Sequence, residues 1–210
     1  VTDERLIRNG GDFAGAAAPV QGVEEVAYFG QPIGVVVAET FEQARAAALM
    51  VNVECEGQEG VFDMMAALDK AEPPTDDIFG LFLIHTEQGD VEAAMADAKA
   101  AVDNIWTTPS HSHAAMEPHC AIAAWDGDTL TVEASYQSPV TSRDQLATVL
   151  GIDAERVRIR SPFVGGGFGG KLGLMPEAAA AAIAAQQLGR PVKVVMQRQT
   201  VFETTGRRPA

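Results

Sequence analysis

The chain is organised around Val164-Gly165-Gly166-Gly167-Phe168-Gly169-Gly170-Lys171, in which five of the six positions from 165 to 170 are glycine. Glycine brings no side chain to a core, but its backbone reaches positive φ without strain and lets a ligand approach the main chain closely. Successive amide N–H groups in such a turn form a concavity that binds anions. The flanking segments are apolar, unlike those beside a flexible linker. The stretch therefore predicts a ligand-binding loop, which Phe168 is expected to fix by burying its ring.

The residue types of this loop match two known phosphate-binding sequence patterns. Gly165, Gly167 and Gly170 fit the dinucleotide pattern G-x-G-x-x-G. Gly165, Gly170 and Lys171 fit the first part of a P-loop, G-x-x-x-x-G-K. A P-loop requires Ser or Thr after its lysine to hold Mg²⁺, whereas Leu172 stands at that position. A P-loop nucleotide binder is therefore kept only as an alternative, which would require ATP or GTP binding that depends on Lys171.

The dinucleotide pattern lacks its structural context. Its helix must begin at the loop so that the helix N-terminus faces the pyrophosphate, and an acidic residue must end the next strand. Here Pro176 delays the predicted helix by several residues, and the next strand ends in Val195-Met196-Gln197 without a carboxylate. A Rossmann site is therefore disfavoured.

The chain on both sides of the loop predicts an α+β fold. Helical spacing of apolar residues and capping signals predict helices over 41–50, 61–68, 90–98, 138–150, 176–188 and a helical turn at 200–203. Short β-branched or alternating runs predict strands over 25–29, 33–38, 51–54, 102–109, 121–125, 129–135, 157–160 and 192–196. The helix over 176–188 has almost no polar face, so it should be buried. Proline and acidic residues over 71–77 predict a linker that divides the chain into domains over 1–78 and 79–210.

Composition excludes several classes of partner. The chain has 210 residues and a formal net charge of −14, which argues against nucleic acid and anionic membranes because both need basic patches. It has two cysteines far apart in sequence, which favours a reducing compartment and a cytoplasmic location. No apolar run is long enough to span a bilayer. The chain begins with Val1 and has no signal-peptide pattern, so we expect a piece of something longer.

Several segments besides the loop carry a family resemblance. They are Tyr28-Phe-Gly-Gln-Pro-Ile33, Gly89-Asp-Val-Glu92, His113-Ala-Ala-Met-Glu-Pro118, Ser135-Tyr-Gln137 and Gly189-Arg-Pro-Val-Lys193 with Arg198. Together with the octapeptide 164–171, they resemble the molybdopterin-binding large subunit of the molybdenum hydroxylases, the family of xanthine dehydrogenase and aldehyde oxidase. The resemblance runs from about Val26 to the end. It implies the C-terminal part of an α/β hammerhead domain over 1–78 and the first part of a molybdopterin-binding α+β domain over 79–210.

The resemblance also implies a cofactor site. In the family the metal is held by the dithiolene of a pterin rather than by protein side chains, so no protein metal ligand is expected. Gln137 matches the glutamine that hydrogen-bonds an oxo ligand of the molybdenum, and an amide can donate to oxide without giving up its proton. The backbone of Gly167, Phe168 and Gly169 would lie against the metal and the pterin. The implied cofactor is a molybdenum–molybdopterin dinucleotide, the cytosine form included, with [2Fe–2S] and FAD groups on partner subunits.

Leu172 bears on the substrate. In purine-oxidising members a glutamate follows the motif's lysine and contacts the heterocycle. Leucine cannot form that hydrogen bond, and a pocket without it should reject purines. The resemblance therefore implies a hydroxylase that oxidises an aldehyde or a similar carbon centre with water as the oxygen source.

The family continues beyond the part that this chain resembles, and its general-base glutamate lies in those later segments. We therefore expect no catalytic residue on this chain, and an internal fragment that is inactive alone. Its expected partners are the rest of the large subunit, an iron–sulfur subunit, an FAD subunit and a small-molecule substrate. The alternative is a cofactor-free fragment or scaffold that docks the iron–sulfur and flavin chains.

A zinc site is disfavoured in the histidine-rich segment. Five potential zinc ligands are close in sequence there, namely His111, His113, Glu117, His119 and Cys120. Their spacing does not match that of a structural zinc site.

Three further residues have simpler expectations. Glu117 is expected to make a structural hydrogen bond. Lys193 and Arg198 are expected to be solvent-facing or domain-pairing charges.

Overall fold

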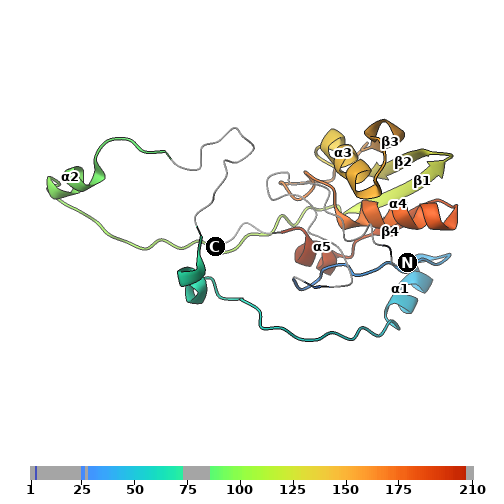
Figure 1. Cartoon of the computed structure of the whole chain (residues 1–210), viewed down its shortest axis with the longest axis horizontal. Coiled ribbons are helices and arrows are strands. Elements are labelled where there is room, and N and C mark those ends of the chain that lie inside the picture. The colour runs from blue at the N-terminus through green and yellow to red at the C-terminus, as the bar shows by residue number, and fades with distance from the viewer. Residues whose placement is uncertain (1–2, 4–24, 27, 73–85, 207–210) are drawn as a thin grey trace. The chain divides into compact units, whose positions relative to one another are not determined.

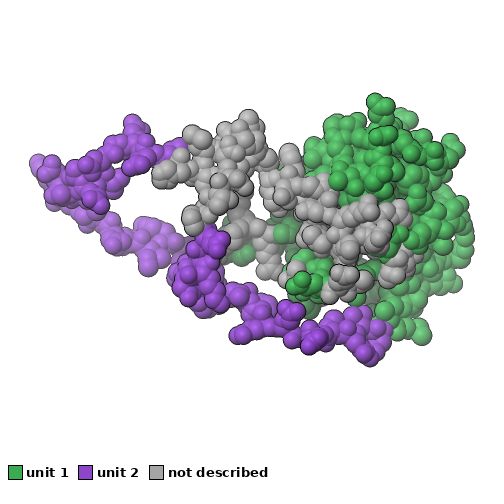
Figure 2. All heavy atoms as spheres, in the orientation of Figure 1, with its two compact units in different colours: residues 1–51, 109–210 green, residues 52–108 purple. Residues whose placement is uncertain are grey.

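The structure, a computed structural model, describes residues 3, 25–26, 28–72 and 86–206. The chain forms two compact units, one made of residues 1–51 and 109–210 and the other of residues 52–108 (Figure 2). Most of the predicted linker, residues 73–77, lies outside the described residues. The division into domains at position 78 stays a prediction.

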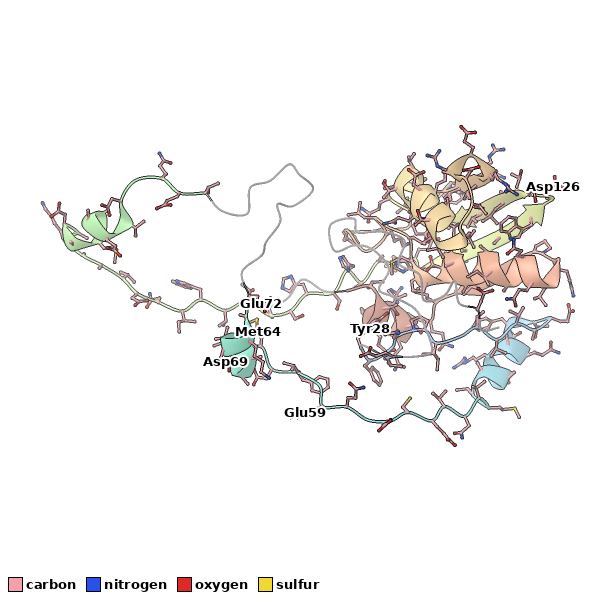
Figure 3. All side chains as sticks on the ribbon, viewed as in Figure 1. Tyr28, Glu59, Met64, Asp69, Glu72 and Asp126 are labelled. Carbon is pink, nitrogen blue, oxygen red and sulfur yellow. The ribbon has the colours of Figure 1, made fainter. Side chains whose placement is uncertain are left out.

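A four-stranded sheet in the order β3-β2-β1-β4 organises the first unit (Figure 1). β1 (Cys120–Asp126) and β2 (Thr129–Ala134) form the predicted hairpin, with Asp126 paired to Thr129 and Asp126 at the hairpin end in Figure 3. β3 (Val157–Arg160) runs parallel to β2, and β4 (Val192–Val195) runs antiparallel to β1. The sheet and its helices confirm a mixed α and β architecture for this unit.

Two helices cover one face of this sheet. α4 (Pro176–Leu188) packs on β1, β2 and β4, and α3 (Pro139–Leu150) packs on β3 and α4 (Figure 1). The sheet residues that face them are apolar and buried: Ala121, Ala123, Leu130, Val132, Val157 and Val192. The alanines over 178–182 are buried as predicted, and the indole N–H of Trp125 donates to the carbonyl of Ala182 at 2.9 Å. The core therefore lies between this sheet face and α3–α4.

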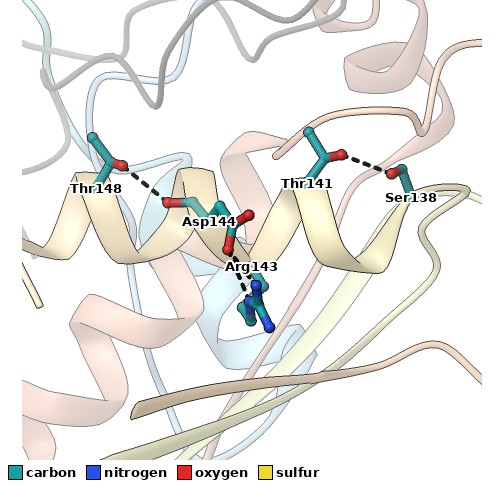
Figure 4. Close-up of polar contacts among 5 residues, drawn as sticks. All are labelled: Ser138, Thr141, Arg143, Asp144 and Thr148. Carbon is teal, nitrogen blue, oxygen red and sulfur yellow. Dashed lines mark hydrogen bonds and ion pairs between the residues drawn. The ribbon is translucent and has the colours of Figure 1, made fainter. Parts of the chain in front are cut away.

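Side-chain hydroxyls make polar contacts along α3, which begins two residues after Gln137. Ser138 is the N-cap residue of α3, and Pro139 follows it in the first turn. The hydroxyls of Ser138 and Thr141 lie 2.8 Å apart, and the hydroxyl of Thr148 donates to the carbonyl of Asp144 at 2.9 Å (Figure 4). The helix ends at Gly151 with φ of 68°, a left-handed cap that favours glycine. Gln137 therefore lies in the short connection between β2 and α3.

The remaining helices of the first unit are short: α1 (Phe41–Ala48), η3 (Ala154–Arg156) and α5 (Arg198–Thr204). The predicted capping box of α1 is present, because Thr40 Oγ1 accepts from the amide of Gln43 and Gln43 Oε1 accepts from the amide of Thr40. α5 is longer than the helical turn predicted over 200–203.

Several predicted strands are wrong. Residues 33–38 form no strand, nor do the described residues of 25–29, of which residue 27 lies outside the described set. Residues 51–54 and 102–109 also form none. A β-branched run becomes a strand only where a neighbour supplies hydrogen bonds and a packed face, and residues 51–54 and 102–109 are exposed.

The second unit has only short helices in its described part: η2 (Met65–Lys70) and α2 (Val91–Ala96). η2 is a 3-10 helix in place of the α-helix predicted over 61–68, and Met64, Asp69 and Glu72 project around it (Figure 3). α2 begins as predicted, with Asp90 Oδ1 accepting from the amide of Ala93 at 2.9 Å, but it ends before residue 98. Among the described residues, no helix is long and apolar enough to cross a membrane.

Candidate functional site

The glycine loop connects β3 to α4, and its backbone takes the conformations that its composition predicts. Gly165, Gly166 and Gly169 have φ of 60°, 90° and 96°, values in which other residues are disfavoured. Phe168 also has a positive φ of 54° and its side chain is 73% exposed. The expectation that Phe168 fixes the loop by burying its ring is therefore wrong, and backbone contacts must hold the loop instead.

Gln137 lies directly against the loop. Its side-chain Oε1 accepts from the amide of Gly169 at 3.0 Å and from the amide of Lys171 at 3.2 Å. Since only the oxygen can accept from two N–H donors, these contacts fix the orientation of the amide group. Its Nε2 has no hydrogen-bond partner among the described residues and is free to donate to a ligand.

Glycine at 167 is needed for this approach. A Cβ atom at that position would lie 2.3 Å from Cδ of Gln137, a distance that real Cβ atoms do not adopt. The absence of a side chain at Gly167 thus lets Gln137 approach the loop closely enough to accept from Gly169 and Lys171.

The segment 113–119 also contacts the loop. The amide of Glu117 donates to the carbonyl of Gly165 at 3.0 Å, and a Cβ at Gly165 would lie 2.2 Å from Cβ of Glu117. The ring of His113 lies beside Gly170, where a Cβ would be 3.0 Å from its Cγ. The main chain of Glu117 therefore has a structural role, while the role of its side chain stays a prediction.

Lys171 is fully buried and turns into the protein. Its ammonium donates to the carbonyl of Val164 at 2.6 Å and to the carbonyl of Glu117 at 2.9 Å. Desolvation lowers the pKa of this group, while the carboxylates of Glu117 and Glu177 oppose the shift. A P-loop lysine must reach the phosphates of its nucleotide, so this geometry contradicts the P-loop alternative.

His119 is buried behind the loop. Its Nε2 lies 2.8 Å from the carbonyl of Gly170, and because a carbonyl only accepts, Nε2 carries the proton. Its Nδ1 is buried without a hydrogen-bond partner in the described part of the chain. Burial is the largest cause that lowers the pKa of His119, to about 4, so the ring is neutral at pH 7.

Arg198 is half-buried and binds the main chain of the same segment. Its guanidinium donates to the carbonyls of Ala115 at 2.7 Å and Met116 at 2.8 Å, and it lies 5.9 Å from the ring centroid of Phe202. The expectation of a solvent-facing or domain-pairing charge is wrong for Arg198, because α5 carries it back toward residues 115–116. Lys193 is exposed.

A buried acid behind the loop was not predicted. The hydroxyl of Tyr136 donates to Oε1 of Glu177 at 3.1 Å and accepts from the amide of Met175 at 3.2 Å. Desolvation raises the pKa of Glu177 to about 7 and raises that of Tyr136 well above its usual value. A second contact, from the amide of Leu174 to Gln145 Oε1 at 2.7 Å, also holds the segment between the loop and α4. The sequence feature that could have indicated this buried acid is a single glutamate, Glu177, in the alanine-rich helix α4.

The other candidate residues are less connected. Leu172 follows Lys171 and is half-buried, and its contact with a substrate stays a prediction. In the part of the chain that the structure describes, no three His, Cys, Asp or Glu side chains are grouped to hold a metal ion.

Comparison with known proteins identifies the class. Residues 72–210 match the family of the molybdopterin cofactor-binding domain. The chain is 40% identical over 193 residues to the aldehyde oxidoreductase molybdenum-binding subunit PaoC of Escherichia coli strain K12, covering 92% of this chain and 26% of that subunit. It is 31% identical over 187 residues to the nicotinate dehydrogenase large molybdopterin subunit of Eubacterium barkeri, covering 88% of this chain and 44% of that one.

Solved structures give the same class. Quinoline 2-oxidoreductase from Pseudomonas putida 86 superposes with a TM-score of 0.66 at 26% identity, covering 78% of this chain and 21% of that chain. Aldehyde oxidoreductase from Desulfovibrio gigas superposes with a TM-score of 0.67 at 24% identity, covering 81% and 19%, and shows the shared fold. The chain belongs to the molybdopterin cofactor-binding domain family of the molybdenum hydroxylases, and it spans about a quarter of the length of PaoC.

Proposed function

We propose that this chain forms part of the cofactor-binding wall of a molybdenum hydroxylase large subunit that oxidises an aldehyde or a similar carbon centre. The observation that carries the proposal is the pairing of Gln137 with the amides of Gly169 and Lys171. This pairing leaves an N–H₂ group beside a loop whose glycines admit a ligand to the main chain. The relative PaoC is named for aldehyde oxidation, which supports the substrate class.

The residues fit the implied cofactor. The proposed contacts are Nε2 of Gln137 and the backbone of Gly167, Phe168 and Gly169. When bound, the molybdenum–pterin group supplies the two-electron oxidation of the carbon centre, and water supplies the oxygen. Gln137 contributes a neutral donor that does not release its proton, and the buried neutral ring of His119 donates to the Gly170 carbonyl and so holds that peptide group in place.

The finer features of the assembly are proposals on the same family basis. They are the cytosine form of the pterin dinucleotide, [2Fe–2S] and FAD on partner subunits, and a hammerhead domain over 1–78 ahead of the molybdopterin-binding domain. We also propose a cytoplasmic location, from the low cysteine content.

The test is to purify the complete large subunit with its partners and measure molybdenum, pterin and aldehyde oxidation. We expect about one molybdenum and one pterin dinucleotide per large subunit, in line with one bound cofactor per site, and substitution Gln137→Ala should reduce both. A complex without molybdenum and pterin would overturn the proposal and favour the alternative of a scaffold that docks the iron–sulfur and flavin chains.

Leu172 is the proposed determinant against purines. Leu172→Glu should raise the ratio of kcat/KM for a purine to kcat/KM for an aldehyde by about tenfold or more, because a hydrogen-bonding group in a pocket strongly discriminates substrates that can pair with it. The ratio is measured on the cofactor-loaded enzyme, with Leu172→Met as the apolar control. An unchanged ratio in the Glu variant would remove Leu172 from the substrate pocket.

A further inference from the structure

We propose that Lys171 is a positioning residue, which closes the glycine loop on itself and holds it in register with Gln137. This inference rests on the proposed function, since the register matters because Gln137 and the loop would contact one cofactor. The loop begins at Val164 and ends at Lys171, and the ammonium of the last residue donates to the carbonyl of the first. The same ammonium donates to the carbonyl of Glu117, whose amide holds Gly165. One buried cation thus ties together both ends of the loop and the segment that contains Glu117.

The main chain of Lys171 makes the connection to Gln137. The amide of Gln137 donates to the carbonyl of Lys171 at 2.8 Å, and the amide of Lys171 donates back to Gln137 Oε1 at 3.2 Å. The backbone of Gln137 is therefore held by Lys171, and its side chain is held by Lys171 together with Gly169. A shift of Lys171 should therefore disturb the position of the free Nε2 of Gln137.

Planarity of the peptide bond explains how the hydrogen bonds of the Val164 and Gly170 carbonyls set the direction of the amides that follow them. In a trans peptide the C=O and the following N–H point in opposite directions. The Val164 carbonyl points to the ammonium of Lys171, so the amide of Gly165 points away from it. The Gly170 carbonyl points to His119, so the amide of Lys171 points the other way, where Gln137 Oε1 receives it.

A lysine is suited to this position for a chemical reason. An ammonium has three donors and no acceptor, so it can satisfy two buried carbonyls from one point. A methionine would fill similar space but leave both carbonyls without that donor, and unpaired buried polar groups are costly. The charge is balanced by nearby acids, since the carboxylates of Glu117 and Glu177 favour the protonated form while Arg198 and desolvation oppose it.

The experiment compares Lys171→Met and Lys171→Arg with the exposed control Lys193→Met in the complete enzyme with its partners. The readouts are the rate of pterin release after dilution, measured by pterin fluorescence, and hydrogen exchange of the Gly169 amide. We expect Lys171→Met to release pterin about tenfold faster or more, with faster exchange at Gly169. Lys193→Met should match the unchanged protein. Lys171→Arg, which keeps two donors, should retain pterin better than Lys171→Met.

Comparison of pterin retention in Lys171→Met and Lys171→Arg distinguishes a positioning role of Lys171 from simple space filling. If Lys171 only fills space, the methionine variant should equal or exceed the bulkier arginine variant in pterin retention, and that order would overturn the inference. Lys171→Met and Gln137→Ala should also be less than additive in the double variant, since both would act through the same amide; full additivity would count against the inference. If the unchanged enzyme carries no pterin, the proposed function fails, and the exchange rate at Gly169 alone decides whether Lys171 positions the loop.

Discussion

Substitution Gly167→Ala should separate Gln137 from the glycine loop while leaving the fold intact. The added Cβ would lie 2.3 Å from both Cδ and Oε1 of Gln137, and this side chain is exposed, so it can swing away at little cost. Its two hydrogen bonds from Gly169 and Lys171 would then be lost. Each such bond stabilises by about 1 kcal/mol. The amides of Gly169 and Lys171 should therefore exchange with solvent several times faster, and the loaded enzyme should retain less pterin.

Two other glycines provide the controls for this prediction. Gly57→Ala adds a Cβ with nothing within 4 Å and should change neither amide exchange nor stability. Gly165→Ala should instead destabilise the fold by about 1–3 kcal/mol, because the Cβ would meet Cβ of Glu117 at 2.2 Å and φ is +60°. Unchanged exchange at Gly169 and Lys171 in Gly167→Ala would mean that Gln137 is not held as described.

The pH dependence of stability should show two opposing contributions behind the loop. His119 has a pKa lowered from 6.5 to about 4. Between pH 6.5 and pH 4 the unfolded chain therefore binds a proton at this ring that the native state does not bind. Stability from this group is therefore lost as pH falls from 6.5 to 4. Glu177 has a pKa raised from 4.5 to about 7, so the native state keeps a proton that the unfolded chain releases. Stability from this group is lost as pH rises from 4.5 to 7.

Between pH 4.5 and 6.5 the contributions of His119 and Glu177 to the free energy of unfolding partly cancel. Single substitutions should reveal each contribution separately. Glu177→Gln should leave the His119 contribution, so that stability increases with pH over this range. His119→Gln, which keeps a donor toward Gly170, should leave the Glu177 contribution, so that stability decreases with pH. Each full contribution is on the order of 3 kcal/mol, measured by urea unfolding at a series of pH values.

The exposed Glu155 supplies the matched control, since Glu155→Gln should leave the pH profile unchanged. The same slope in Glu177→Gln, His119→Gln and the unchanged protein would show that these two groups do not dominate the titration of the folded state.

The sequence correctly predicted the elements whose boundaries are set by local turn and capping residues. The Asp126-Gly127 turn, the Pro139 start and Gly151 end of α3, and the alanine run of α4 each specify a short stretch of backbone. The strands predicted over 33–38 and 102–109 failed because a β-branched run does not supply its own partner strand. An isolated run of this kind predicts a strand only when the rest of the sheet is known.

The site was predictable in part. The sequence resemblance brought Gln137 and the loop into one hypothesis, although these residues lie about 30 positions apart along the chain. The interactions of Lys171 with Glu117 and of His119 with Gly170 join residues 54 and 51 positions apart, and no local pattern encodes them. Arg198 was expected to be a solvent-facing or domain-pairing charge, whereas its partners are the backbone carbonyls of Ala115 and Met116, which the sequence does not distinguish from other carbonyls.

The residues that hold the loop come from three separate places in the chain, which has a consequence for the order in which the site forms. Glu117 and His119 precede the hairpin, Gln137 follows it, and residues 115–119 are in turn held by Met196 and Arg198. Contacts at such separations form late, because the entropy of closing long chain segments must be overcome first. The loop and its partners therefore acquire their arrangement only after β4 has joined the sheet and Arg198 of α5 has bound residues 115–116. A cofactor that binds this loop would find its site only after that step.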